Sequence, residues 1–417
     1  MTAMDLIDRA FEESKEEMAS VWKRIDATVM TNQERVLDSF IAERVSLHHM
    51  SPSTGYGYGD AGRDTLDRLY ARVFGAESGL VRTHWSSGTH ALKTALFALL
   101  RPGDDVLCVT GPSYDTLSPV TGAGRGGLKD FGITYREIDC LLRYEEGSIG
   151  IDSVEQELAD NLRSNTKVIY IQRSRGYTPR KSISVGSLQD FMGVVREKFP
   201  GIWTIVDNCY CEFTGTVEPP MLGVSLTVGS LIKNPGGGLA PTGAYAVGSR
   251  DAVARVAESL YAPGLGAETG SCPAGYRDIY QGLFLAPKVV GECLKGIAFA
   301  ASFLRRLGFE VDPGPFEERS DIVQAVTLGS PERLRRFAQA IQASSPVDSF
   351  ATPEPWDMPG YERKIIMAAG TFVQGSSIEL SCDGPFTEPY IAYLQGGLTK
   401  EHVMLAVKKA ATIVLTT

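Results

Sequence analysis

The stretch SLIKNPGGGLAPTGAYAVG, residues 230–248, places one lysine between a short apolar run and three consecutive glycines. Residues 225–229, SLTVG, predict a buried strand just before Lys233, and residues 244–248, AYAVG, predict the next strand. A lysine at a strand end suits Schiff-base chemistry, because burial makes its amine partly neutral and able to attack an aldehyde. The glycines would let the backbone approach a planar ligand. Taken alone, the stretch fits a surface lysine before a glycine turn better than a catalytic one.

Other short apolar runs around this stretch predict a mostly parallel sheet. Helical stretches separate these runs, an alternation that indicates an α/β fold in which helices cover both faces of the sheet. Ligands in such folds bind beyond the carboxyl ends of the strands, which is where Lys233 lies. The further predicted strands are residues 105–109, 133–138, 167–172 and 203–207.

The pattern divides the chain into three parts. Near the N-terminus, apolar residues at helical spacing predict one helix over 4–24 and another over 31–46, the second opened by a capping box of Thr31 and Glu34. After Pro287 a long helical stretch leads into further strands and helices, which predicts a second, smaller α/β domain. The predicted parts are an N-terminal helical arm (1–47), a large sheet-containing domain (48–286) and a small C-terminal domain (287–417).

Composition narrows the class of protein. The chain has 417 residues, 43% of them hydrophobic, which is enough for a large core. The formal net charge of −9 disfavours nucleic acid and anionic membrane surfaces as partners. The N-terminus is acidic and no window holds eighteen uninterrupted apolar residues, so we expect a cytoplasmic protein that does not bind membranes.

The cysteines do not suggest a metal site or a disulfide framework. There are seven, an odd number without paired spacing, which indicates reduced thiols. Cys209 and Cys211 form a C-x-C pair, but no second Cys or His pair stands nearby at ligand spacing. We therefore expect no metal ion.

A second part of the sequence supplies a carboxylate that a pyridoxal phosphate enzyme needs. TIVDNCYCEF ends a buried strand at Asp207, so this side chain should reach the same sheet edge as Lys233. An aspartate there can keep a pyridine nitrogen protonated and so maintain the electron sink of the cofactor. A helix N-cap or turn is the alternative explanation for Asp207.

Two more segments could bind such a cofactor. Ser87, Gly88 and Thr89 open a strongly apolar helix, whose first backbone amides can bind phosphate. Tyr114 follows strand 105–109 and could stack on a cofactor ring, while Ser230 could add a hydroxyl to the phosphate site. A capped helix and a packed tyrosine are the ordinary alternatives, but the order of all these elements is more specific than any one of them.

The ordered set SSGTHA, GPSY, VDNCY and SLIKNPGGG resembles the fold-type I pyridoxal phosphate enzymes of cysteine and methionine metabolism, which include cystathionine lyases and methionine gamma-lyase. Within this group the chain is similar to the methionine gamma-lyase family proteins described as aluminium-resistance proteins. That likeness spans almost the whole chain. It rests on PSTGYGYGDAGRDTLDRLYARVFGAE, IQRSRGY, VDNCYCEF, SLIKNPGGGLA, MPGY, IMAAGTFVQGSSIELS and YLQGGLT.

The resemblance implies the fold and the cofactor site. The implied fold is the pyridoxal phosphate-dependent transferase fold type I, with a seven-stranded sheet in the large domain. Lys233 would hold pyridoxal 5'-phosphate covalently, Asp207 would pair with its ring nitrogen and Tyr114 would stack on the ring. The phosphate-binding residues implied by the resemblance are Ser87, Gly88, Thr89 and Ser230.

The sequence departs from the family pattern at two points. Tyr58 matches a tyrosine that reaches into the neighbouring subunit's site, with Tyr56 as a further substrate-binding candidate, but Asp60 replaces the arginine beside it and Arg63 would have to substitute. Near the C-terminus, Glu379 occupies the region of the arginine that grips the substrate carboxylate. The candidates for that role, chosen because arginine binds carboxylates in a bidentate manner, are Arg173, Arg175 and Arg363.

The implied activity is β- or γ-elimination from an amino acid with a thioether, thiol or halide leaving group. Lys233 would move the Cα proton, and Tyr58 or Tyr114 would assist the leaving group as an acid. Three alternatives stay open: a specialised γ-eliminase that forms an alkyne from a vinyl-halide amino acid, an aminotransferase, and a cofactor-binding regulator or metal-tolerance protein without catalysis. The resemblance also implies a homodimer or homotetramer with shared active sites.

Overall fold

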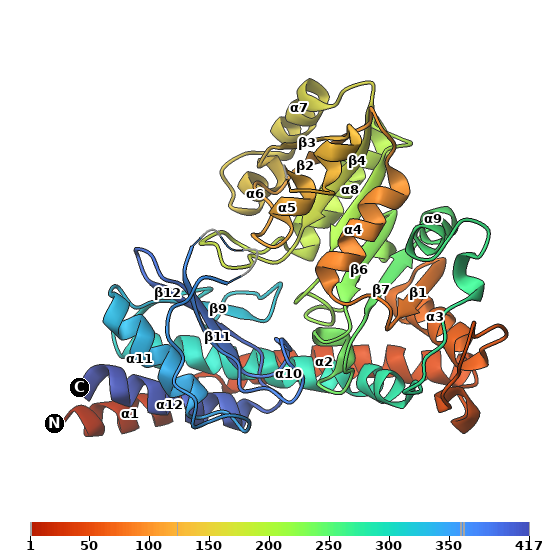
Figure 1. The fold of residues 1–417 in the computed structure, drawn as a ribbon. Helices are drawn as coiled ribbons and strands as arrows, with labels where there is room; N and C mark the ends of the chain where they lie inside the picture. The colour runs from red at the N-terminus through yellow and green to blue at the C-terminus, as the bar shows by residue number, and fades with distance from the viewer. Residues whose placement is uncertain (1, 123, 359–360, 362, 417) are drawn as a thin grey trace.

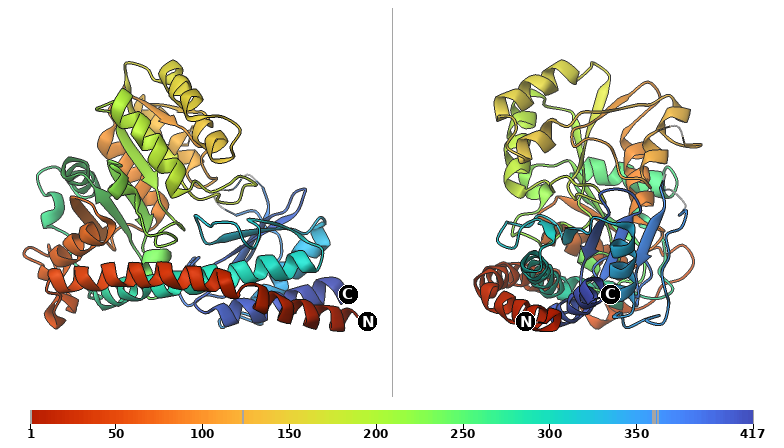
Figure 2. Two further views of the ribbon diagram at one scale, coloured as in Figure 1. Left: turned by 180° about the vertical axis from the view of Figure 1, so that it is seen from behind. Right: turned by 90° about the vertical axis from the view of Figure 1, so that its left-hand side faces the viewer.

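The computed structural model describes residues 2–122, 124–358, 361 and 363–416, so part of the MPGY stretch lies outside the described residues. Two sheets stand above a base of long helices (Figure 1). Helices α2 (Ala19–Ala42) and α10 (Arg277–Arg306) run along this base beneath both sheets, and the two chain termini lie at the same end of it (Figure 2). The base therefore connects the two sheet-bearing parts of the molecule.

The larger sheet has seven strands in the order β1-β7-β6-β5-β4-β2-β3. Strand β7 runs antiparallel to both of its neighbours, whereas the other pairings are parallel. The predicted fold class is therefore confirmed. The strands are β1 (Ser78–Arg82), β2 (Asp105–Cys108), β3 (Thr134–Glu137), β4 (Thr166–Gln172), β5 (Trp203–Asp207), β6 (Leu226–Ser230) and β7 (Ala244–Gly248).

Helices cover both faces of this sheet because its strands carry apolar residues on both sides. In β2, Val106 packs into the core on one face and Leu107 into the core on the other. In β4, Val168 and Ile169 divide between the same two cores. The surrounding helices are α3 (Ala61–Phe74), α4 (Gly88–Leu99), α5 (Ser118–Thr121), α6 (Cys140–Glu145), α7 (Ile151–Asn161), α8 (Val185–Lys198) and α9 (Arg250–Leu260).

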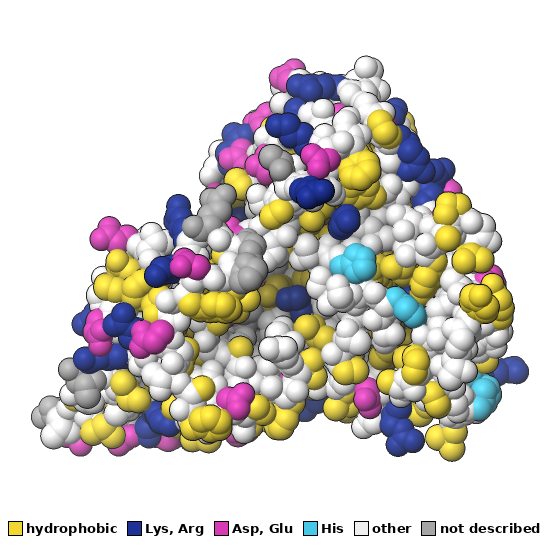
Figure 3. Space-filling view, in the orientation of Figure 1, with side chains coloured by type: hydrophobic (Ala, Val, Ile, Leu, Met, Phe, Trp, Pro, Cys, Tyr) yellow, Lys and Arg dark blue, Asp and Glu magenta, His cyan; other side chains and the backbone are white. Residues whose placement is uncertain are grey.

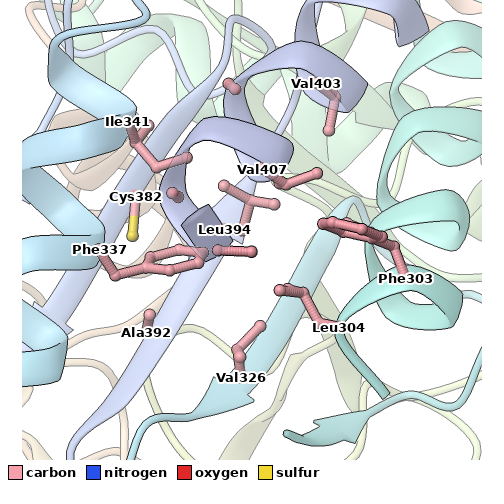
Figure 4. Packing of buried hydrophobic residues seen from close by; sticks show 14 of the residues in the cluster. Phe303, Leu304, Val326, Phe337, Ile341, Cys382, Ala392, Leu394, Val403 and Val407 are labelled. Carbon is pink, nitrogen blue, oxygen red and sulfur yellow. The ribbon is translucent and has the colours of Figure 1, made fainter. Parts of the chain in front are cut away.

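The smaller sheet is antiparallel, in the order β10-β11-β12-β9-β8. One of its faces packs against helices in a hydrophobic core that includes Phe303, Phe337 and Leu394 (Figure 4). The other face is turned toward the large sheet. The elements are β8 (Glu310–Asp312), β9 (Val323–Thr327), α11 (Pro331–Gln342), β10 (Ile365–Ala368), β11 (Ser381–Pro385), β12 (Ile391–Gln395) and α12 (Lys400–Thr416).

The two N-terminal helices differ from those that the sequence predicts. Helix α1 (Ala3–Glu17) ends at Met18, and α2 begins directly after it and runs through residue 31 without a break. The predicted capping box is wrong, because Thr31 lies inside α2 and its hydroxyl donates to the Ala27 carbonyl one turn earlier. A Thr followed three residues later by a Glu therefore does not mark the start of a helix here, because the helix already runs through these positions.

Pro287, after which the pattern of predicted strands and helices changes, lies inside the thirty-residue helix α10. The helix begins under the large sheet and ends against the small one. The predicted domain boundary between residues 286 and 287 therefore lies inside a continuous helix, and the division into two domains stays a prediction. None of the described helices is both long and apolar enough to cross a membrane.

Candidate active site

Lys233 lies in the loop between β6 and β7, directly before a short 3₁₀ turn over Asn234–Gly236. Other residues of the chain fill the space beside the glycines that follow Lys233. The expectation that these glycines let the backbone approach a ligand is therefore wrong. A Cβ on Gly236 would lie 1.8 Å from the Leu231 carbonyl oxygen, and one on Gly237 would lie 2.4 Å from the carbonyl oxygen of Gly282 in α10. The glycines let this turn fold tightly against α10 and so fix the position of Lys233.

The lysine side chain is held by two residues that the sequence analysis did not identify. Its Nζ donates to Ser377 Oγ at 3.2 Å and lies 3.7 Å from the ring centroid of Tyr210. Tyr210 has a left-handed backbone, with φ of 73°, which is unusual for a tyrosine and typical of residues fixed at functional sites. The clue in the sequence was its position three residues after Asp207, just beyond the strand end.

The charge state of Lys233 also differs from the expectation that burial makes its amine partly neutral. Burial by itself would lower the pKa of its amine, but Tyr210, Cys209 and Asp207 act in the opposite direction and the pKa is raised above its usual value. The raised pKa favours the ammonium form of Lys233 as long as no aldehyde is bound to it. Only the burial of Lys233 can be inferred from the sequence around it, because its neighbours Tyr210, Cys209 and Asp207 come from another segment.

Asp207 ends β5, which is next to β6 in the sheet. Its Oδ1 accepts a hydrogen bond from the backbone N–H of Cys209 at 3.0 Å. Burial raises the pKa of this carboxyl group, while the charges on Lys233 and Arg180 lower it. Because Asp207 ends β5 and Lys233 follows the neighbouring strand β6, both residues lie at the sheet edge where the sequence predicted them, and each affects the pKa of the other.

The predicted phosphate-binding segments meet beside this pair. A Cβ on Gly88 would lie 3.4 Å from Ser230 Cβ, so the start of α4 approaches the end of β6. Ser87 caps α4 by accepting from the His90 N–H, and the first amides of the helix have no acceptor within it. Thr89 Oγ1 lies 3.1 Å from the hydroxyl oxygen of Tyr114. The structure thus brings Ser87, Gly88, Thr89, Tyr114 and Ser230 together.

Residues of the smaller sheet complete the surroundings of Lys233. Asp383 in β11 is buried, which raises the pKa of its carboxyl group to about 6, although the charge on Lys233 acts in the opposite direction. Asp383 Oδ2 accepts hydrogen bonds from the Tyr177 hydroxyl at 2.6 Å and from Gln395 Nε2 at 2.7 Å. The molecule is hollowed between its two sheet-bearing parts, and hydrophobic and uncharged side chains dominate there (Figure 3).

The predicted carboxylate-binding arginines have partners or surroundings of their own. Arg173 donates to Asn208 Oδ1, Arg175 forms an ion pair with Asp312, and Arg363 is exposed. Their role toward a substrate stays a prediction. Glu379 has a structural role, since it accepts the backbone N–H groups of Phe372 and Val373 at 2.8 and 3.0 Å and so shapes the loop before β11.

Tyr56 and Tyr58 lie in the loop before α3, with their rings stacked at 5.4 Å and with 71% and 62% of their surfaces exposed. They belong to the surface of this chain and not to the buried group around Lys233. Arg63 has partners close to it in the chain. It is buried and bonds to the Gly57 carbonyl and to Asp64.

The residues present fit pyridoxal phosphate. Gly88 leaves no side chain between the start of α4 and the end of β6, so free backbone amides border that space. A buried amine and a buried carboxylate lie at the same sheet edge. This donor set matches an anionic phosphate, an aldehyde and a protonated ring nitrogen.

Comparison with known proteins places the chain in a family. The uncharacterized protein YnbB of Bacillus subtilis is 45% identical over 414 residues, which cover 98% of this chain and 97% of YnbB. L-methionine gamma-lyase of Pseudomonas putida is 30% identical over 205 residues, covering 48% of this chain and 45% of that enzyme.

Solved structures agree with this placement. The structure of a proposed cystathionine beta-lyase involved in aluminium resistance from Listeria innocua superposes with a TM-score of 0.93 at 45% identity, and each chain is fully covered. A carbon-sulfur lyase involved in aluminium resistance from Clostridium novyi gives a TM-score of 0.91 at 43% identity, with 97% of this chain and 95% of the other covered.

A more distant structure shares only the fold. The pyridoxal-5'-phosphate dependent protein YhfS of Escherichia coli is 17% identical, with a TM-score of 0.63 over 93% of this chain and 96% of YhfS. The model of the methionine gamma-lyase family matches residues 7–415. The chain is therefore a member of the methionine gamma-lyase family.

Proposed function

We propose that this chain is a pyridoxal phosphate-dependent lyase that eliminates a sulfur leaving group from an amino acid. The observation that carries the proposal is the buried pair of Lys233 and Asp207 at the carboxyl edge of the large sheet, beside the start of α4. Family membership supports it, as do the carbon-sulfur lyase and cystathionine beta-lyase names of close structural relatives.

Each group of the site has a part in holding the cofactor. Lys233 would bind its aldehyde, Asp207 would keep its ring nitrogen protonated and Tyr114 would stack on the ring. The amides at the start of α4, with the hydroxyls of Thr89 and Ser230, would bind its phosphate. When bound, the cofactor supplies an electron sink for the carbanion formed at the substrate Cα.

The proton transfers would belong to this chain. Lys233 becomes a neutral amine when the substrate amine takes its place at the aldehyde, and its Nζ, which Ser377 and the Tyr210 ring hold in place, would then accept the Cα proton. The Tyr114 hydroxyl, which lies 3.1 Å from Thr89 Oγ1, would donate a proton to the leaving group. General acid–base assistance of this kind contributes about 10²–10⁴-fold to the rate.

The test is to incubate the cofactor-loaded protein with amino acids that carry thioether, thiol or halide groups. Keto acid with ammonia and a released thiol supports the proposal. An unsaturated amino acid without keto acid would instead indicate a specialised eliminase, and amino-group exchange with a keto acid would indicate an aminotransferase. A cofactor spectrum that responds to amino acids without any product would indicate a non-catalytic protein.

Tyr56 and Tyr58 support a second element of the proposal, a shared site between subunits. Two stacked and largely exposed tyrosines are suited to enter a site on a neighbouring chain. The test is to mix two impaired variants, Lys233→Ala and Tyr58→Phe, under conditions that exchange subunits. Recovered activity supports shared sites in a homodimer or homotetramer, and no recovery counts against them.

A further inference from the structure

Asp383 occupies an unusual position for an acidic residue, in the middle of a strand in the small sheet. Its neighbour Cys382 points into the hydrophobic core shown in Figure 4. Because side chains alternate along a strand, Asp383 points to the opposite face, with its cross-strand partner Tyr393. Tyr393 packs there near Tyr177 and Tyr210, two residues from the large domain. Asp383 therefore faces the candidate active site.

Only one oxygen of the Asp383 carboxylate is satisfied. Oδ2 accepts from both Tyr177 and Gln395, whereas Oδ1 is buried and has no hydrogen-bond partner among the described residues. Asp383 is only 4% exposed. A buried carboxylate oxygen without a donor is costly, and a purely structural acid would have both oxygens bonded. Asp383 Oδ1 can therefore accept a hydrogen bond from a donor other than the residues that the structure describes.

The charges around Asp383 point to the kind of donor. Burial raises the pKa of its carboxyl group to about 6, while the hydrogen bonds and the Lys233 ammonium lower it. Tyr177, Tyr210, Tyr361 and Tyr393 also face this region and bring no positive charge, and Asp115 lies near Tyr361. Arg175 lies near Tyr393, but its charge is paired with Asp312 at 2.6 Å. If Lys233 binds an aldehyde cofactor, it no longer offers Asp383 a free ammonium group. A cation from the substrate can then take the place of that ammonium group beside Asp383.

We propose that Asp383 is a specificity-determining residue that binds an ammonium group at the far end of the substrate side chain. This inference rests on the proposed function and names its substrate class: a thioether amino acid whose leaving group carries a second amine. The free Oδ1 would accept a charge-assisted hydrogen bond from that amine. A substrate with a terminal carboxylate would be rejected, because it would place two like charges in a buried site.

The test uses the cofactor-loaded protein and matched substrates. S-(2-aminoethyl)-L-cysteine and S-propyl-L-cysteine have nearly the same shape, S-carboxymethyl-L-cysteine carries the opposite charge, and the homocysteine counterparts cover γ-elimination. We expect kcat/KM to be at least about tenfold higher for the amine than for the propyl compound. Equal values, or a preference for the carboxylate, would overturn the proposal.

Two variants locate the preference in Asp383. Asp383→Asn retains an acceptor for Tyr177 and Gln395 but removes the charge, and should reduce the amine preference by about tenfold or more. Cys382→Ala, one residue away on the opposite face of the strand, should leave the ratio unchanged. A preference that survives in Asp383→Asn would contradict the assignment.

Binding separates this inference from the proposed elimination. The change in cofactor absorbance on titration with each compound gives a Kd that does not depend on turnover. Tighter binding of the amine without elimination would overturn the proposed function and support the role of Asp383. Elimination without preference would overturn the role of Asp383 alone, and no response to any compound would overturn both.

Discussion

Two buried carboxylates act on Lys233, and they come from different kinds of structure. Asp207 ends a parallel strand of the large sheet and accepts a hydrogen bond from a backbone amide two residues later. Asp383 lies within an antiparallel strand of the small sheet and is held by side chains distant in sequence. The first is positioned by local structure and the second by the meeting of two domains. We attribute cofactor chemistry to the first and substrate choice to the second.

The largest expected effect concerns the amine between these carboxylates. Lys233→Ala should abolish keto acid formation, because it removes the group that binds the cofactor aldehyde and moves the Cα proton. Lys295 offers a matched control, since it is also a buried lysine but pairs with Asp26 and Glu292 away from the site. Lys295→Met should retain activity, and substantial turnover by Lys233→Ala would refute the assignment.

Asp207→Asn should have the next largest effect. The amide can still accept the Cys209 N–H, but the negative charge is lost, so kcat/KM should fall by on the order of a hundredfold or more. Asp105 lies at the opposite edge of the same sheet, where it pairs with Arg136 at 2.6 Å. Asp105→Asn should lower the melting temperature without a comparable loss in kcat/KM. Similar kinetic losses in both variants would remove the distinction between the two sheet edges.

Asp383→Asn should change stability in a pH-dependent way. Folding raises the pKa of the Asp383 carboxyl group from 3.8 to about 6. The contribution of the neutral carboxyl group to the free energy of unfolding is therefore fully present below pH 3.8 and is lost as the pH rises through about 6. The shift corresponds to at most about 3 kcal/mol. The variant should therefore melt at a higher temperature than the wild type at pH 8, with little difference near pH 4. A melting difference that does not vary with pH would contradict this account.

The smallest effect is expected on cofactor affinity, as distinct from turnover, when the Tyr114 hydroxyl is removed. Tyr114→Phe keeps the aromatic ring but removes the hydroxyl that lies 3.1 Å from Thr89 Oγ1. Loss of one such hydrogen bond costs about 1 kcal/mol, so cofactor affinity should fall only several-fold. Equilibrium dialysis measures this change. A loss of a hundredfold or more would show that the hydroxyl contacts the cofactor directly.

Much of the large domain could be predicted from the sequence. Its central strands are apolar runs bounded by polar residues, so the residue that ends such a run, as Asp207 does, lies at the sheet edge where ligands bind. Strand β1 was harder to recognise, because SGLVR is short and contains glycine and arginine. The break at Met18 was also not predicted, since no glycine or proline marks it.

The contribution of the small domain could not be predicted. A lone acid in an alternating strand normally indicates a solvent-exposed face, and the sequence does not show that another domain covers it. Tyr210 and Ser377 were missed for the same reason, because their contacts with Lys233 join segments far apart in the chain. Local pattern identifies the strand ends, whereas long-range packing decides which side chains surround them.

The most direct test of the central claim is reduction of the pyridoxal phosphate-loaded protein with borohydride, followed by peptide mapping. Our account predicts a stable pyridoxyl group on the peptide that contains Lys233, and none on that peptide in Lys233→Ala. A chromophore that is not fixed by reduction, or a pyridoxyl group found on a different lysine, would contradict the account.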